Sequence, residues 1–120
     1  MNVADIVLFA TAAAVEDNYV VDAEKLLAGD GRQAVRNVYS DESDQFHAGV
    51  WRGEVATWRV RYTEHEFCHM LTGEVKITDA TGESITVRAG DSFVIPAGFV
   101  GVWQVLQPAS KLYVIFESKR

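Results

Sequence analysis

The chain has 120 residues, enough for one compact domain with its own hydrophobic core. Its net charge of −6 argues against a nucleic-acid partner, because neutralising phosphates requires a basic patch, and gives no reason to expect binding to an anionic membrane surface. A single cysteine excludes an intrachain disulfide and fits a reducing compartment, so we expect a cytoplasmic protein.

The first 30 residues differ in pattern from the rest of the chain. Their apolar run, 6–15, is too short to cross a bilayer and lacks the preceding Lys or Arg of a signal peptide. Asp22 can cap a short helix over 23–31, with Leu26 and Leu27 on its apolar side. We therefore expect a short helical or extended N-terminal segment, residues 1–30, that packs on the domain or on a partner subunit.

From residue 31 onward the sequence is a series of short segments rich in Val, Ile, Phe, Tyr and Trp, most of them separated by turn residues. The expected strands are 33–40, 48–55, 57–62, 66–71, 74–79, 83–88, 92–96, 101–106 and 111–117. Tight connections are expected at 72–73, 80–82 and 89–91. Because no helical pattern separates the strands, we predict one antiparallel, all-β sandwich or barrel over residues 31–120.

Two parts of this region carry glycine and proline at regular spacing. In the first, five residues separate Gly53 from Arg59, one separates Arg59 from Arg61, four separate Arg61 from Glu66, and six separate Glu66 from Gly73. In the second, five residues separate Gly90 from Pro96, and Gly98, Gly101 and Val105 follow. Gly73 and Gly90 stand where hairpin turns need a positive φ, and 96–98 is expected to be a turn that ends a strand.

This spacing resembles the two cupin motifs, G-x5-H-x-H-x3-4-E-x6-G and G-x5-P-x-G-x2-H-x3-N. The segments GVW (49–51), RYTEHEF (61–67), LTGEVKITD (71–79) and AGDSFVIPAGFVGVWQV (89–105) are similar to the branch that holds ureidoglycine aminohydrolase and the ethanolamine-utilisation cupins. The resemblance, which covers roughly residues 26–117, implies a cupin jelly-roll β-barrel with an internal ligand pocket, and commonly a homodimer.

The usual cupin metal centre is three imidazoles and one carboxylate. At the corresponding positions this chain has Arg59, Arg61 and Gly101 in place of histidines, and only Glu66 remains. Two arginines would repel a dication, so we expect no metal and no other cofactor. The alternative is a divalent metal held by Glu66 with His65 or His69, although strand alternation places His69 on the opposite face from Glu66.

The strand before Glu66 can be oriented in two ways, which differ in the set of side chains that points into the barrel. If the motif register holds, Arg59 and Arg61 point into the barrel, where their guanidinium groups could bind a carboxylate, phosphate or ureido group. If apolar alternation decides, Trp58, Val60 and Tyr62 point inward and the arginines face solvent. In that case Tyr62 is the pocket residue that could donate to a ligand or to Glu66.

The candidate functional residues follow from this geometry. A carboxyl group inside an apolar barrel has a raised pKa unless a cation pairs with it. Glu66 is therefore the expected general acid or base, or, if Arg59 or Arg61 pairs with it, one half of a structural ion pair. Tyr62 is the second catalytic candidate. Trp103, two residues beyond the glycine in a histidine position, is expected either to pack in the core or to form a wall of the ligand site. Cys68 shares the inward face, as a buried thiol or a ligand contact.

Three functions agree with these expectations. The first is an enzyme of small-molecule nitrogen metabolism that uses Glu66, as the resemblance to ureidoglycine aminohydrolase implies. The second is a metal-free barrel that binds or senses a small polar or anionic metabolite without turnover. The third is a structural subunit of a larger assembly. We favour a ligand-binding protein, with or without enzymatic activity, whose partner is a small molecule and not nucleic acid or a membrane.

Overall fold

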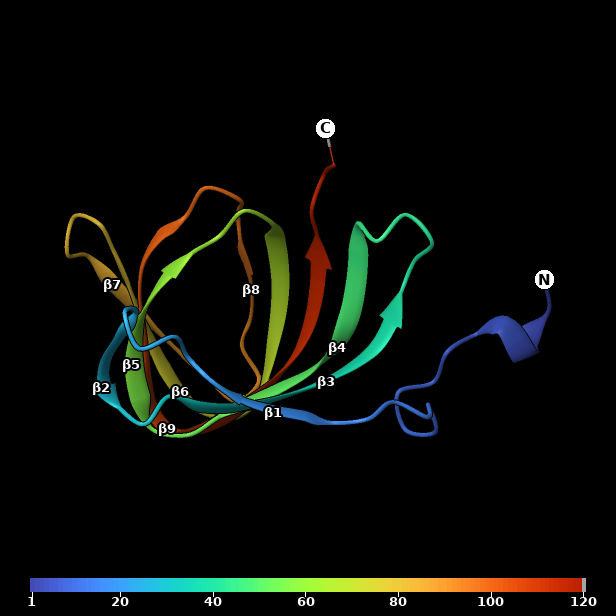
Figure 1. Cartoon of the computed structure of the whole chain (residues 1–120), viewed down its shortest axis with the longest axis horizontal. Helices are drawn as coiled ribbons and strands as arrows, with labels where there is room; N and C mark the ends of the chain where they lie inside the picture. The colour runs from blue at the N-terminus through green and yellow to red at the C-terminus, as the bar shows by residue number, and fades with distance from the viewer. Residues whose placement is uncertain (120) are drawn as a thin grey trace.

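A computed structural model describes residues 1–119, in which nine antiparallel strands form one curled sheet (Figure 1). The strands are β1 (Asp17–Val20), β2 (Leu26–Gly29), β3 (Arg32–Ser40), β4 (Phe46–Gly53), β5 (Ala56–Arg61), β6 (His65–Asp79), β7 (Ser84–Arg88), β8 (Ser92–Ile95) and β9 (Val100–Phe116). This architecture confirms the expected all-β jelly roll. Within residues 1–119, no helix is long and apolar enough to cross a membrane.

Strand β9 is the centre of the sheet, because it pairs with three other strands along its length. Its first part, 100–105, pairs with β5, and its last part, 109–116, pairs with β4. Strand β6 runs antiparallel to almost all of β9 on its other edge. The strands expected separately at 101–106 and 111–117 are therefore one continuous strand, which carries side chains from one end of the barrel to the other.

Strand β6 is also longer than expected, since it joins the segments 66–71 and 74–79. Its register against β9 shifts around Gly73, which has φ +82°. A Cβ at Gly73 would meet the carbonyl oxygen of Pro108 and the Cα of Ala109 at 2.6 Å. The hairpin connection expected at 72–73 is therefore wrong: Gly73 has the predicted positive φ, but it forms a bulge that bends one strand.

The helix expected over 23–31 is also wrong. Only one turn forms there, in which the amides of Lys25 and Leu26 donate to the carbonyl of Asp22. The next residues form β2, which pairs with β5 through partners that include Leu26 and Trp58. Pairing with a neighbouring strand satisfies the backbone groups that a helix would have bonded internally. Strand β1 likewise pairs with β3, so residues 17–29 contribute two strands to the sheet.

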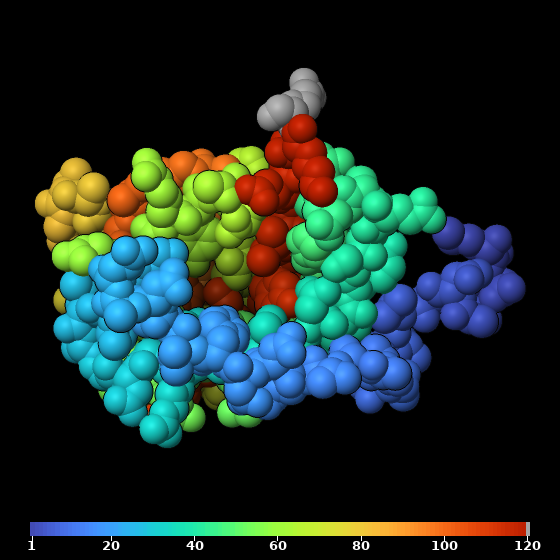
Figure 2. Space-filling model, viewed as in Figure 1, coloured from blue at the N-terminus to red at the C-terminus, as the bar shows by residue number. Residues whose placement is uncertain are grey.

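The residues before β1 extend away from the barrel as an arm, drawn dark blue in Figures 1 and 2. It contains a short 3-10 helix, Val3–Asp5, and is otherwise extended or turned. The arm is held to the sheet by Arg36, whose guanidinium donates to the carbonyls of Phe9 at 3.1 Å and Ala12 at 2.8 Å. An ion pair between Arg52 and Glu16 fixes its last residues.

The inside of the barrel is packed at one end and open at the other. Met70, Val75 and Val105 are almost completely buried and lie in one core cluster with three tryptophans. Those tryptophans, Trp51, Trp58 and Trp103, also line a pocket, whereas Met70, Val75 and Val105 do not. The three tryptophans thus connect the packed core to the pocket.

Candidate functional site

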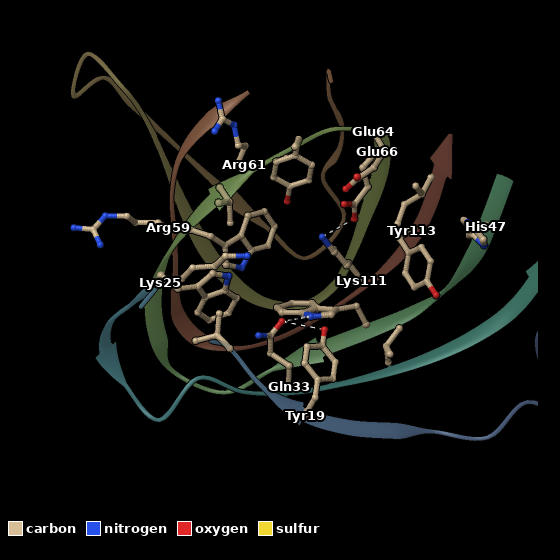
Figure 3. Close-up of a pocket in the computed structure, with 18 of the residues that line it drawn as sticks. Tyr19, Lys25, Gln33, His47, Arg59, Arg61, Glu64, Glu66, Lys111 and Tyr113 are labelled. Atoms are coloured by element: carbon tan, nitrogen blue, oxygen red, sulfur yellow. Dashed lines mark hydrogen bonds and ion pairs between the residues drawn. The ribbon is translucent and has the colours of Figure 1, made fainter. Parts of the chain in front are cut away.

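The pocket has a volume of about 500 Å³ and lies on the inner face of the curled sheet. Its lining includes Tyr19, Gln33, Trp51, Trp58, Tyr62, Glu66, Trp103, Lys111 and Tyr113. Strands β1, β3, β4, β5, β6 and β9 all contribute (Figure 3). In the space-filling view, the molecule is hollowed above the blue β1–β2 segment (Figure 2). The pocket is thus assembled from residues that are far apart in sequence.

A buried ion pair between Glu66 and Lys111 forms the floor of this pocket. The Lys111 ammonium lies 2.8 Å from Glu66 Oε2, and the two residues are 5% and 6% exposed. Glu66 comes from the beginning of β6 and Lys111 from the second half of β9, two strands that pair directly. A charge buried to this degree is stable only when it is paired, so each group depends on the other.

Two indole rings hold the ammonium of Lys111 in place. Its Nζ lies 4.4 Å from the ring centroid of Trp103 and 5.1 Å from that of Trp51. The two rings pack edge to face, with centroids 5.8 Å apart and planes at 90°. Cation–π attraction of this kind partly replaces the water that the ammonium loses on burial. Trp103 therefore lies at the pocket wall as expected, and it also supports the charge.

Burial disfavours the charged form of Lys111, but the attraction of the Glu66 carboxylate outweighs it, so the pKa of Lys111 is raised. Lys111 is thus a cation at neutral pH. Burial raises the pKa of Tyr62 and raises that of Tyr113 to about 12, so both phenols stay protonated. The hydroxyl of Tyr113 donates to the side-chain oxygen of Asn37 at 2.7 Å.

Cys68 lies behind the ion pair and not at the pocket surface. It is completely buried, and its Sγ donates to Glu66 Oε2 at 3.3 Å. Burial raises the pKa of its thiol to about 12. The expectation that Cys68 contacts a ligand is not supported by this position, because the residue is absent from the pocket lining. Its contact with Glu66 makes it a support for the carboxylate.

The structure decides between the two registers of β5 in favour of apolar alternation. Trp58 is buried and Val60 and Tyr62 are half-buried on the pocket side, whereas Arg59 and Arg61 are exposed. Figure 3 shows both guanidinium groups pointing away from Glu66. The register with the arginines inside the barrel is therefore wrong, because it would place Trp58 in solvent. The two arginines stand at the pocket rim.

The residues at the cupin metal positions do not fit a metal in this chain. Arg59 and Arg61 face outward, and a Cβ on Gly101 would meet the carbonyl oxygen of Thr78 and the ring of Phe99. No group of three or more His, Cys, Asp and Glu side chains suited to a metal occurs in residues 1–119. The one remaining ligand position, Glu66, faces the Lys111 ammonium.

The histidines considered as substitute ligands lie elsewhere. His69 Nδ1 is 2.7 Å from the hydroxyl of Ser92 on the adjacent strand β8. His65 Nδ1 accepts the amide of Ala97 at 3.1 Å, and its ring stacks on Phe116. Both point to the opposite face from Glu66, which is buried while His65 is exposed and His69 half-buried. The expected alternation along this strand is confirmed.

Sequence reasoning missed Lys111, Trp51 and Gln33 as pocket residues. The signal for Lys111 is parity: Trp103, Val105, Ala109, Lys111 and Tyr113 are all odd-numbered and all buried. If 101–117 is one strand, this alternation places Lys111 on the face of Trp103. A lysine near the start of an expected strand is ordinarily solvated, so its position at 111 does not by itself indicate a pocket residue.

Comparison with known proteins agrees with the fold. The EutQ-like cupin domain family matches residues 40–113, more than half of the chain. The chain is 33% identical to a DUF861 family protein from Thermotoga maritima, over 53% of this chain and 73% of that one, with a TM-score of 0.52. No curated protein gives a significant match.

Two EutQ structures align over nearly their whole length. For the ethanolamine utilization protein Q from Salmonella typhimurium, the identity is 20%, the TM-score 0.66, and the coverage 91% of this chain and 99% of that chain. For the Clostridium difficile EutQ protein, the identity is 17%, the TM-score 0.67, and the coverage 92% and 99%. At these identities the likeness concerns the fold alone. With the family match over 40–113, it shows that this chain belongs to the EutQ-like cupin domain family.

Proposed function

We propose that this protein binds a small polar metabolite in the barrel pocket without a metal ion, with Glu66 and Lys111 as the central polar groups. The observation that carries the proposal is the buried ion pair, 2.8 Å long, at the floor of a pocket of about 500 Å³. Lys111 supplies a fixed cation beside the retained cupin glutamate. A ligand can therefore be polarised there without a metal.

The ion pair leaves hydrogen-bonding capacity for a ligand. Both Lys111 Nζ and Cys68 Sγ contact Glu66 Oε2, whereas Oε1 has no hydrogen-bond partner within residues 1–119. An ionised carboxylate oxygen can accept further hydrogen bonds, so Oε1 is the expected contact atom. Because the pKa of Lys111 is raised, its role is that of a charge and not of an amine nucleophile, which would need a lowered pKa.

A second candidate is catalysis on a compact nitrogen compound, in line with the resemblance to ureidoglycine aminohydrolase. It is favoured by the free Oε1 of Glu66 and by the Tyr62 hydroxyl, because both residues line the same pocket. In this version Glu66 accepts a proton from the substrate and Tyr62 orients it. If Glu66→Gln turned over a confirmed substrate as fast as the parent protein, this mechanism would be wrong.

Elemental analysis and ligand screening together test the binding proposal. Purified protein is expected to contain less than stoichiometric metal, and its thermal stability to be unchanged by a chelator. A panel of small amides, ureides and carboxylates is then screened for an increase in Tm, which grows with ligand excess over Kd. A stoichiometric metal whose removal abolishes ligand binding would contradict the proposal.

We extend the proposal to a cytoplasmic homodimer. The single free cysteine, Cys68, supports a reducing location. The exposed apolar side chains of the N-terminal arm, which include Ile6, Leu8 and Val15, support association with a second copy. Light scattering of the full chain tests the dimer, and a monomer mass at micromolar concentration would contradict it.

A further inference from the structure

Gln33 is held in one orientation at the floor of the pocket. Its Oε1 lies 2.9 Å from Trp51 Nε1 and 3.1 Å from the hydroxyl of Tyr19. An indole N–H can only donate, so the atom that it meets must be the amide oxygen. This chemistry settles which end of the amide is which. The nitrogen Nε2 is then the free end, with no hydrogen-bond partner within residues 1–119.

Gln33 belongs to the same floor as the ion pair. One indole connects them, since Lys111 Nζ lies 5.1 Å from the ring centroid of Trp51, while the N–H edge of that ring bonds to Gln33. Gln33 and Glu66 both line the pocket. In Figure 3 the dashed lines join Gln33 to its two partners, and its amide nitrogen points away from Tyr19. The pocket floor thus offers a donor with a fixed direction.

The charges at this floor balance. A negative head group on a ligand would be attracted by Lys111 but repelled by Glu66, 2.8 Å from that ammonium. A positive head group would meet the reverse situation. Placing an unpaired charge in such a desolvated site is costly. An uncharged group that carries both a donor and an acceptor avoids this cost, and its chemistry complements the acceptor Glu66 Oε1 and the donor Gln33 Nε2.

We propose that Gln33 is a specificity-determining residue, which selects a ligand with an uncharged head group by donating from Nε2 to its carbonyl or hydroxyl oxygen. Glu66 accepts the donor of the same head group. This inference rests on the proposed binding function and narrows its ligand class. Any charge on the ligand would lie at the rim, near the exposed guanidinium groups of Arg59 and Arg61.

Three aromatic probes of matched shape test the head-group preference: benzamide, benzoate and benzylamine. Each is titrated into ¹⁵N-labelled full-length protein at neutral pH, and the signals of the Gln33 amide and the Trp51 indole are followed by NMR. Benzamide is expected to shift both signals and to bind at least about tenfold more tightly than either charged probe, the effect of roughly one hydrogen bond. This ranking requires no variant.

Gln33→Glu then removes the donor while keeping two oxygens that accept from Trp51 and Tyr19. Its affinity for benzamide is expected to fall about tenfold. Gln107→Glu, at an exposed position outside the pocket lining, is the control for the added charge and should leave the affinity unchanged. Thermal melting confirms that both variants are folded.

The outcomes separate this inference from the proposed function. If benzoate or benzylamine binds as tightly as benzamide, or if Gln33→Glu binds benzamide like the parent, the role of Gln33 is overturned while the pocket stands as a binding site. If none of the three probes shifts the signals of pocket residues, both the inference and the proposed function fail.

Discussion

The floor and the rim of the pocket both carry charged side chains, but their environments differ. At the floor, Glu66 and Lys111 are buried and meet at 2.8 Å. At the rim, Arg59 and Arg61 are exposed, and Arg59 donates to the carbonyl of Glu24 at 3.5 Å. Exposed charges are screened by water, whereas buried ones interact strongly. The identity of a charged residue thus says less about its role than its depth does.

The largest expected effect is the loss of Lys111. Lys111→Met leaves the Glu66 carboxylate buried without a cation, so the free energy of unfolding should fall by about 3–5 kcal/mol in urea denaturation. Lys25→Met, at the rim, is the matched control and should change it by less than about 0.5 kcal/mol. Replacing both floor charges, Glu66→Leu with Lys111→Met, should recover most of the loss. A Lys111→Met variant as stable as the parent would show that the buried charge at the floor contributes no more to stability than an exposed charge at the rim.

The next largest effect on stability is expected at Gly101, a cupin metal-ligand position that leaves no room for a side chain. Gly101→His introduces a Cβ against the carbonyl of Thr78, and is expected to cost about 1–3 kcal/mol without creating zinc affinity. Val100→His, on the same strand but exposed, is the control and should be tolerated. Calorimetric zinc titration and urea denaturation provide the two readouts. Tight zinc binding by Gly101→His would show that the floor can still open for a metal.

Alkaline pH should lower the free energy of unfolding through the thiol of Cys68, which contacts Glu66 at the pocket floor. The unfolded thiol loses its proton near its ordinary pKa of 9.0, whereas burial keeps the folded one protonated up to a pKa of about 12. The unfolded state then binds fewer protons, so stability falls as pH rises above 9, with a slope that approaches about 1.4 kcal/mol per pH unit. Cys68→Ala should flatten the profile between about pH 9 and 10, before tyrosines titrate.

That profile is measured by urea denaturation at several pH values. The slope is the readout, because Cys68→Ala also lowers stability at every pH by leaving a cavity. Leu71→Ala on the exposed face of the same strand controls for truncation and should keep the parent slope. An equal slope in Cys68→Ala and the parent would mean that the thiol is not desolvated.

The smallest effect is expected at the rim. Arg59→Ala and Arg61→Ala should each change the free energy of unfolding by no more than about 0.5 kcal/mol, because both side chains are solvated. Their effect on benzamide affinity should also be below about twofold. If Arg59→Ala or Arg61→Ala lost as much benzamide affinity as Gln33→Glu, the ligand would be recognised at the rim and not at the floor.

Several parts of the fold and the site were predictable from residue pattern. Spacing placed Glu66 and Trp103 on an inward face, and both line the pocket. The positive φ of Gly73 and Gly90 was also correct, at +82° and +94°. These features depend on local chemistry: alternation along a strand and the freedom of glycine. The role of Gly73 was wrong because a bulge and a hairpin require the same backbone conformation.

Other parts were beyond local pattern. The region after Asp22 has helix-forming residues, yet it pairs with β5 as β2. Arg59 and Arg61, on the preceding strand β5, are the cations nearest to Glu66 in sequence, but its partner is Lys111 on β9. Propensity is a weak prior that strand pairing overrides, and no local signal reports which distant strand lies alongside.

The amino-acid sequence by itself determined the curled antiparallel sheet, because alternating apolar residues bury one face and glycines permit the bends. It also determined that the usual metal ligands are replaced. Only the tertiary structure decided which charges became the floor, since a shift of one residue in register exchanges inside for outside. That register brought Lys111 to Glu66 between Trp51 and Trp103, and left the two arginines in water.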